Sequence, residues 1–241
     1  WELLGGRANI EIVGYLGHST DNLGVKGWFT LQQQRDHIVA FMRERRERGA
    51  AYNTGKTMVI GHSIGAEMAV HALHTLGTKH IARVVGLMPF LLVNRDSALQ
   101  RLMSAMVHFR PLVSAVAAAV GFVRGLFPAA LRWLLMDRPV TKGMDPGPAA
   151  LTKRWLRRNS VLNWALMGRT EFDALQRLDH RFHEYADRLG FLYCQDDHWA
   201  PVAQHDEFKR TMPTSMQLVL EKSPMVDHAF VLTDTAARKI A

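Results

Sequence analysis

Cysteine is almost absent from this chain: Cys194 is the single one among 241 residues, which excludes an internal disulfide. Cys194 lies in an apolar stretch, so we expect a packed thiol rather than a reactive one. The sequence also lacks a His-Glu-x-x-His segment and any paired Cys/His spacing typical of metal ligands. We therefore expect neither a metal site nor a cofactor.

Acidic residues are scarce in one part of the chain only. The whole chain has 30 Lys/Arg and 22 Asp/Glu, a net charge of +8. Residues 95–169 hold 12 Lys/Arg and only 3 Asp/Glu, so this block carries +9 and the remainder −1. A basic block of this kind could bind nucleic acid, an anionic membrane surface or an acidic protein partner.

Long hydrophobic runs are also missing, but two shorter runs lie inside the basic block. Residues 111–123 form an uncharged apolar run of 13 residues, and residues 125–136 form a second run that Arg132 interrupts. Neither reaches the roughly 20 residues needed to cross a bilayer. Two short apolar helices with a Gly/Pro break and cationic flanks (Arg124, Arg132 and residues 153–158) are typical of an interfacial hairpin. The alternative is a hydrophobic lid over an active site, and the two are compatible. Long aliphatic runs are a poor surface for phosphates or bases, so we do not expect this block to bind nucleic acid.

Around this block, predicted strands alternate with predicted helices. The expected strands are residues 10–16, 57–61, 81–88, 191–194 and 216–220, and the expected helices are 31–48, 66–76, 204–212 and 229–240. Alternation of this kind predicts a mostly parallel sheet that is covered on both faces. We therefore expect an α/β core made of residues 1–94 and 171–241, with residues 95–170 as a basic, apolar helical cap or membrane-surface insertion.

The most informative motif is Gly61-His-Ser63-Ile-Gly65, which follows an apolar strand and precedes a helix rich in small residues. Strand, Gly-x-Ser-x-Gly and helix in this order are the nucleophile elbow of an α/β-hydrolase. The turn is so tight that the glycines must lack side chains. Ser63 is then a candidate nucleophile, and the backbone N–H of Ile64 is a candidate oxyanion donor.

A serine nucleophile needs a base and an orienting acid, which follow it in the order Ser, Asp, His in this fold. The loop after the strand at 191–194 holds Asp196 and Asp197. Such loops often run Gly-x-x-Asp-x-x-x-Pro, and counting back from Pro201 favours Asp197 as the acid, with Asp196 as the alternative. His228 follows the last strand, where the fold delivers its base.

The remaining histidines near these motifs have plainer interpretations. His198 and His205 come too early in the chain for the base and are expected at the surface. His62, His71 and His74 surround the elbow helix and are expected to be packing or solvent-exposed residues.

Taken together, Gly61–Gly65, residues 192–201 and residues 227–230 resemble the lipid droplet-associated hydrolase family, and residues 14–19 and 31–38 match its style. The resemblance implies Ser63 as nucleophile, Asp197 as acid and His228 as base. It also implies ester hydrolysis of neutral lipid, with sterol ester as the usual candidate. The apolar block, residues 104–136, would attach the protein to lipid droplets and to the cytosolic face of the endoplasmic reticulum.

One part of the family pattern is not found. The second oxyanion donor comes from a Gly-rich loop upstream of the strand at 10–16, so we expect an N-terminally incomplete chain whose first strands are missing. Loss of one such donor costs on the order of 10²–10³ in rate. The strand at 10–16 would then lack its inner neighbour and lie about two strand spacings, roughly 10 Å, from the elbow strand.

These observations favour a serine ester hydrolase that acts on neutral lipid at a droplet surface. Two alternatives remain open at this point. One is a soluble carboxylesterase or thioesterase whose basic block is only a lid. The other is a hydrolase-fold protein that binds droplets with little turnover.

Overall fold

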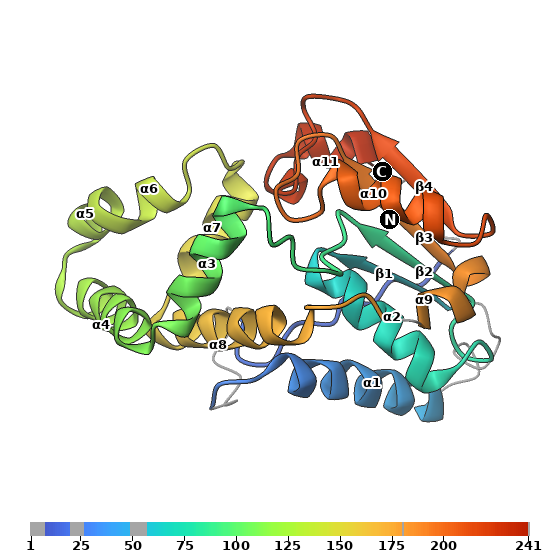
Figure 1. Ribbon diagram of the computed structural model, residues 1–241. Helices are drawn as coiled ribbons and strands as arrows, with labels where there is room; N and C mark the ends of the chain where they lie inside the picture. The colour runs from blue at the N-terminus through green and yellow to red at the C-terminus, as the bar shows by residue number, and fades with distance from the viewer. Residues whose placement is uncertain (1–7, 20–26, 49–56, 180, 241) are drawn as a thin grey trace.

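A four-stranded parallel sheet forms the centre of the molecule (Figure 1). The structure, a computed structural model, describes residues 8–19, 27–48, 57–179 and 181–240. The strands lie in the order β1 (Met58–His62), β2 (Arg83–Leu87), β3 (Leu189–Cys194) and β4 (Gln217–Glu221). Parallel neighbours need crossover connections, and helices supply them. The carboxyl ends of all four strands therefore meet at one edge, where the functional loops emerge.

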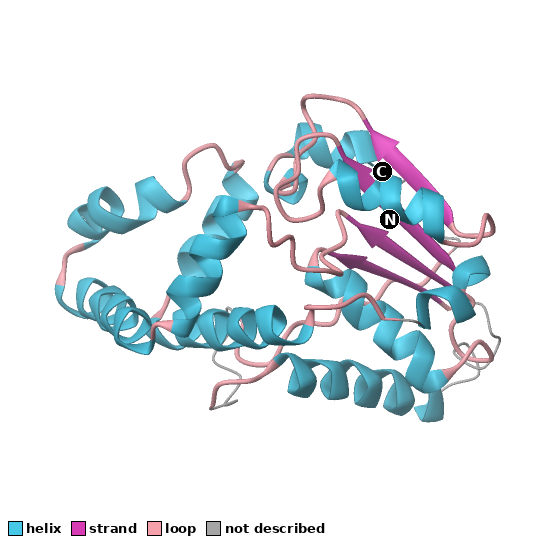
Figure 2. Cartoon of the chain, in the orientation of Figure 1, coloured by secondary structure: helices cyan, strands magenta, loops and turns pink. Residues whose placement is uncertain are grey.

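Helices cover both faces of the sheet (Figure 2). The helices outside the basic block are α1 (Leu31–Arg48), α2 (Ile64–Leu76), α9 (Arg181–Glu184), α10 (Val202–Thr211) and α11 (Asp234–Ile240). Side chains alternate along β3: Phe191 and Tyr193 pack with α2 and α10, whereas Cys194 packs on the opposite face with α11. This alternation follows from the two-residue period of a strand and explains why β3 is apolar throughout.

The basic block forms a group of helices beside the sheet, on the left in Figure 1. Its members are α3 (Ala98–His108), α4 (Arg110–Leu126), α5 (Ala129–Arg132), a π-helical turn (Trp133–Asp137), α6 (Arg138–Val140), α7 (Pro146–Trp155) and α8 (Arg158–Ala174). A small apolar cluster joins Ala117, Met136, Leu156 and Leu162. Among the described residues no single helix is long and apolar enough to span a membrane. The pair α3 and α4, bent by 80°, reaches the necessary length and composition only when taken together.

The predicted strand at residues 10–16 is wrong, because the structure has no strand there. Backbone groups of this segment are bound elsewhere: the Gln34 side chain accepts a hydrogen bond from Leu16 N–H (2.8 Å) and donates one to Leu16 C=O (2.9 Å). A cavity of about 440 Å³ separates the segment from β1. In the described part of the chain no ladder joins the two. A strand needs a neighbour for its hydrogen bonds, and here the neighbouring position is open.

The predicted helix at residues 229–240 is interrupted. A 3₁₀ turn (Phe230–Leu232) comes first, Thr233 is extended (φ −133°, ψ 135°), and α11 begins only at Asp234. The N–H of Asp234 donates to the Asp145 carboxylate (2.6 Å), so a contact with the basic block fixes the start of α11. The other expected elements begin and end within two residues of the observed ones.

Candidate active site

Ser63 lies on a sharp turn between β1 and α2. Its backbone has φ 55° and ψ −123°, and residues other than glycine rarely adopt a positive φ. The turn brings Gly61 against Gly65: a Cβ on Gly61 would lie 2.1 Å from the Gly65 carbonyl oxygen, so no other residue fits at position 61. The Ser63 N–H donates to the Leu87 carbonyl (3.0 Å), which ties the strained residue to the end of β2. Strain of this kind is typical of a functional site.

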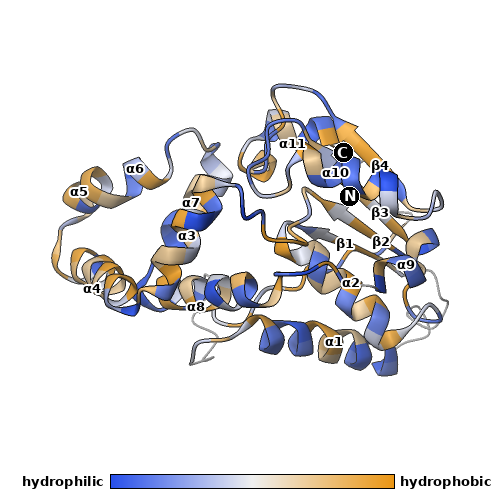
Figure 3. Cartoon of the chain, in the orientation of Figure 1, coloured by the Kyte–Doolittle hydropathy of each residue, from blue (hydrophilic) through white to orange (hydrophobic). Residues whose placement is uncertain are grey.

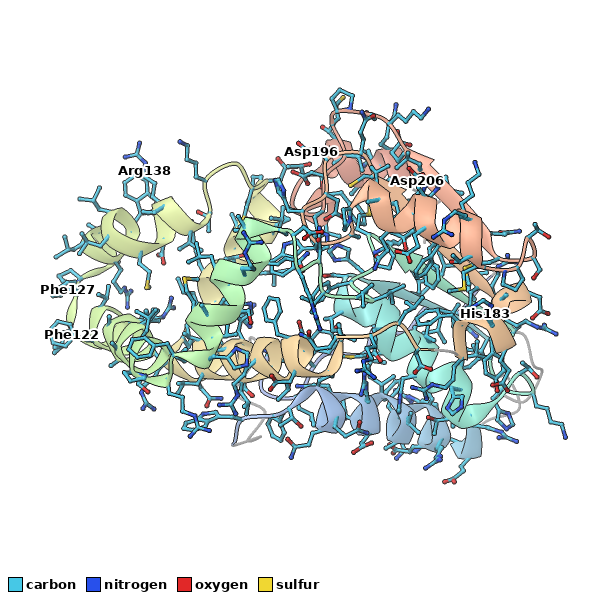
Figure 4. The ribbon with its side chains drawn as sticks, in the orientation of Figure 1. Phe122, Phe127, Arg138, His183, Asp196 and Asp206 are labelled. Carbon is cyan, nitrogen blue, oxygen red and sulfur yellow. The ribbon has the colours of Figure 1, made fainter. Side chains whose placement is uncertain are left out.

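The structure brings Ser63, His228 and Asp197 into one hydrogen-bonded chain. His228 Nε2 lies 2.9 Å from Ser63 Oγ, and His228 Nδ1 lies 3.0 and 2.9 Å from the two carboxylate oxygens of Asp197. Each residue comes from a loop at the carboxyl edge of the sheet. Asp196, the alternative acid, is exposed and contacts Asp227 in an isolated β-bridge; Figure 4 labels it in the loop that follows β3. The geometry therefore favours Asp197.

Asp197 is held as a buried carboxylate. Burial alone raises its pKa, but the hydrogen bond and positive charge of His228, and the backbone N–H groups of Ala200 and Trp199, outweigh burial and keep the pKa below its ordinary value. The two N–H groups donate to Asp197 Oδ1 at 2.9 and 2.7 Å. Asp197 thus stays ionised at neutral pH and oriented towards His228 Nδ1.

His62, expected to be a packing or solvent-exposed residue, contacts His228. Its Nε2 donates to the His228 carbonyl oxygen (2.8 Å), and the two rings lie 5.1 Å apart. Burial, and then the charge of His228, lower the pKa of His62, so its ring is neutral and the N–H proton sits on Nε2. Sequence position gives no signal for this contact, since 166 residues separate the two.

Replacing His62 by phenylalanine should therefore alter the position of the His228 ring while the side chains of Ser63 and Asp197 are retained. The variant keeps an aromatic ring but loses the donor to the His228 carbonyl, so kcat should fall by about 10- to 100-fold through misplacement of the base, with little change in KM. Steady-state kinetics on a soluble ester measures the split. The control is His74→Phe on the exposed end of α2, where kcat should stay at the wild-type value. Equal kcat in both variants would show that the His62 contact positions nothing.

A cavity of about 370 Å³ opens beside Ser63. Most of its wall is apolar, with Phe90, Met103, Val107, Trp164, Met167 and Phe172 among the lining residues. Ile64 also lines it, and its N–H is one of the first in α2, where helical amides have no partner within the helix. This N–H could donate a hydrogen bond to the oxyanion that develops on the carbonyl oxygen of a bound ester.

Besides Ser63, three polar side chains interrupt the apolar wall: Tyr15, His18 and Glu171. Burial, and then the negative charge of Glu67, raise the pKa of Glu171 from its ordinary 4.5 to about 7. Burial, and then the charges of Glu171 and Glu67, raise the pKa of Tyr15 to about 12. Tyr15 lies in the segment 14–19 that matches the family's style, but no motif assigned a role to Tyr15 or to Glu171.

The raised pKa of Glu171 has a consequence for stability. The folded state holds this proton more tightly than the unfolded state, so the contribution is fully present below about pH 4.5 and is lost as pH rises through about 7. Over that range the free energy of unfolding of the wild type should fall relative to Glu171→Gln, by an amount on the order of 1–3 kcal/mol. Urea unfolding at pH 4.5 and pH 8 measures it. A difference between the two proteins that does not change with pH would contradict the shift.

The other expected features have mixed outcomes. Cys194 is buried as expected, and burial, followed by the charges of Asp197, Asp227 and Asp196, raises its pKa to about 12. His198 is exposed as expected, but His205 is only 6 % exposed, because it packs edge-on against Tyr193. Within the described ranges no cluster of three or more His, Cys, Asp or Glu side chains could hold a metal ion.

The fold has clear relatives among solved structures. An α/β hydrolase fold protein from Burkholderia ambifaria matches with a TM-score of 0.54, 12% identity and coverage of 89% of this chain and 72% of that one. A carboxylesterase from the thaumarchaeon Nitrososphaera gargenis matches with a TM-score of 0.52, 18% identity and coverage of 92% and 72%. At such identities the likeness concerns the fold alone, and the fold is that of the α/β-hydrolases.

Sequence relatives point to one family. The lipid droplet-associated hydrolase of Rattus norvegicus is 24% identical over 206 residues, which are 85% of this chain and 60% of the relative. The protein of that name from Dictyostelium discoideum is 25% identical over 243 residues, covering 91% and 71%. The chain thus spans about 60% of the length of the rodent relative. The family model described as lipid-droplet associated hydrolase matches residues 2–231, and the chain belongs to this family.

Proposed function

We propose that this protein is a serine hydrolase of carboxylic esters. The observation that carries the proposal is the hydrogen-bonded chain from Ser63 Oγ through His228 to the buried Asp197. Three residues from three separate loops meet with the distances that proton transfer requires. The family name and the hydrolase fold support the same reaction class.

The proposed reaction has two halves. Ser63 Oγ attacks the acyl carbonyl carbon while His228 Nε2 takes the hydroxyl proton, and the Ile64 N–H binds the oxyanion that forms. His228 then returns the proton to the leaving alcohol, and an acyl-enzyme remains. A water molecule gives a proton to His228 and attacks the acyl carbonyl carbon; the bond to Ser63 Oγ then breaks, His228 returns the proton to this oxygen, and the carboxylic acid is released. Asp197 keeps the His228 ring oriented and balances its charge in both halves.

The apolar cavity supports a lipid ester as the substrate class. An acyl chain would be desolvated by the aromatic and aliphatic side chains beside Ser63. Neutral lipid esters, sterol esters among them, are the substrates that the family resemblance implies. Neither a metal nor a cofactor takes part in the proposed reaction.

We further propose that residues 104–136, within a cap or surface insertion formed by residues 95–170, attach the protein to a lipid surface. The outer face of α4 and the turn after it expose large apolar side chains, and Figure 3 shows apolar colour over α4 and α5. Phe122, Leu126 and Trp133 are 57%, 67% and 48% exposed. Figure 4 shows Phe122 and Phe127 at the end of the molecule farthest from the sheet. Such a cluster would suit the acyl boundary of a droplet or of the endoplasmic reticulum.

The cationic contribution differs in detail from the expected one. Arg124 and Arg132 point partly inwards: Arg124 donates to the Lys153 carbonyl (2.8 Å) and Arg132 to the Arg124 carbonyl (3.2 Å). Arg154, Arg157 and Arg158 of the expected flank are exposed, and so are Arg110 and Arg138, which the sequence did not single out. These exposed arginines are better placed for anionic headgroups than Arg124 and Arg132, each adding about 1 kcal/mol near such a surface.

Labelling with a fluorophosphonate tests the hydrolase proposal directly. The probe should phosphonylate Ser63 in the wild type, identified by the mass of the Ser63 peptide, and should fail to label Ser63→Ala. Absence of label on Ser63 in a folded wild type would contradict the proposal and favour a droplet-binding protein without turnover. Labelling together with equal turnover of dissolved and droplet-borne esters would favour a soluble carboxylesterase or thioesterase with a lid.

A further inference from the structure

The cavity beside Ser63 has a polar wall that the proposed reaction does not use. Tyr15 and Glu171 contribute to it from opposite parts of the chain, Tyr15 from the segment before α1 and Glu171 from α8. The rest of the wall is largely aliphatic and aromatic. A carboxyl group in such surroundings is costly unless something binds it.

Nothing within the described part of the chain binds these two groups. Neither the Glu171 carboxyl nor the Tyr15 hydroxyl has a hydrogen bond or ion pair with any described residue. Both nevertheless face a cavity rather than the core, since both residues line it and remain partly exposed. Apolar ligand cavities commonly carry a few polar groups that fix the orientation of the bound molecule, so two unpaired polar groups facing one apolar cavity indicate a polar contact with a ligand.

The polar wall lies close to the reacting atoms. A Cβ placed on Gly65 would be 3.1 Å from the Tyr15 hydroxyl oxygen, and Gly65 is the second residue after Ser63. The Tyr15 ring packs edge-on against His18 (5.9 Å), which stacks on Trp155 (6.2 Å), so the wall is held in place. A group bound there belongs to the part of the substrate next to the ester, not to the far end of an acyl chain.

The two groups complement a hydroxyl. With its pKa raised to about 12, the Tyr15 hydroxyl keeps its proton and can donate. With a pKa of about 7, the Glu171 carboxyl is present in both forms near neutral pH and can accept or donate. A hydroxyl group is both donor and acceptor and could bind both side chains at once.

We propose that Tyr15 and Glu171 form a subsite for a free hydroxyl next to the scissile ester, so that the preferred substrates are hydroxyl-bearing esters such as partial acylglycerols. The inference rests on the proposed hydrolase function and narrows its substrate class. A sterol ester or triacylglycerol has no hydroxyl and would leave both groups unpaired, and sites built to bind a hydroxyl reject such analogues strongly.

Non-hydrolysable ligands test the subsite without turnover. The two ligands are 1-O-hexadecylglycerol and its di-O-methyl derivative, which share the chain and the ether but differ in free hydroxyls. Binding to the whole chain is followed by tryptophan fluorescence, since Trp155, Trp164 and Trp199 line the cavity. The hydroxyl ligand should bind at least about 10-fold more tightly than the methylated one.

Two variants test whether Tyr15 and Glu171 cause the preference for the ligand with free hydroxyls. Glu171→Leu should bring the affinity ratio close to one without weakening the methylated ligand, and Tyr15→Phe, which removes one oxygen atom, should lower the ratio by about 3-fold or more. Glu207→Leu, on the exposed face of α10, is the control and should keep the wild-type ratio. If Glu171→Leu fails to fold, Tyr15→Phe carries the test.

Equal binding of the two ligands, no binding of either, or a ratio unchanged in both variants would overturn the subsite. Failure of the underlying function has a different signature, because it is the absence of fluorophosphonate label on Ser63. The ether ligands report on the cavity whether or not Ser63 reacts.

Discussion

Replacing Asp197 by asparagine is expected to lower kcat for ester hydrolysis by about 10³- to 10⁴-fold, the largest effect of any near-isosteric change in this protein. Asparagine keeps the size of the side chain and can still accept hydrogen bonds from the Trp199 and Ala200 N–H groups. It lacks the negative charge that stabilises protonated His228, and its amide can hold the ring in the wrong tautomer. Binding of substrate should change little, so KM should stay close to the wild-type value.

Asp196→Asn is the matched control, because it makes the same chemical change one residue earlier on an exposed side chain. Its kcat should lie within about 2-fold of the wild type, since exposed charges are largely screened. Steady-state kinetics on a soluble ester and thermal melts of both variants complete the comparison. A larger loss in Asp196→Asn than in Asp197→Asn would transfer the role of the acid to Asp196.

The second large effect is expected for attachment to lipid droplets. Substituting Phe122, Leu126 and Trp133 together by serine should weaken partition onto droplets by roughly 10²-fold or more, because each large apolar side chain contributes about 1.5–3 kcal/mol when fully buried. These residues are exposed, so the change should leave the thermal stability nearly unaltered. Deleting residues 104–136 is a coarser test, since Ala117 and Met136 pack against residues of α8.

Flotation of the protein with artificial droplets measures the partition. Val219→Ser with Met225→Ser is the control, because both side chains are exposed and apolar but lie on or just after β4, away from the helices of the basic block. Flotation of this control should match the wild type. Unchanged flotation of the triple variant would contradict attachment through this surface. Raising the salt should weaken binding to anionic droplets only modestly if apolar burial dominates.

Local patterns predicted the parts of the site that are local in the chain. The strand, the turn at Ser63 and the helix after it are encoded within residues 57–76, because the positive φ and the close approach of Gly61 to Gly65 depend on neighbouring residues. The loop spacing that favours Asp197 over Asp196 is local in the same sense. The sequence could also predict that His228 follows the last strand, since the order of strands and helices determines which loops reach the same edge of a parallel sheet.

Tertiary contacts decided the rest. Residues 10–16 have the composition of a strand, but a strand forms only beside a partner, and here Gln34 binds the backbone of Leu16 instead. The predicted last helix is divided near Asp234 by a contact with Asp145, which lies 89 residues away. His205 is buried because Tyr193 packs against it. Each outcome depends on a neighbour that no local window of sequence contains.

Dependence on distant neighbours also explains which functional groups could not be predicted from the sequence. His62 binds the His228 carbonyl across 166 residues, and the polar wall joins Tyr15 to Glu171 from two distant segments. Neither pair has a characteristic spacing. His62 and His228 meet because the end of β1 and the loop after β4 lie at the same edge of the sheet, and Tyr15 and Glu171 meet where the segment before α1 and α8 line the cavity beside the elbow. Types of residue and their order along the chain therefore determined the class of chemistry, whereas the shape and polarity of the substrate cavity were determined only by the folded chain.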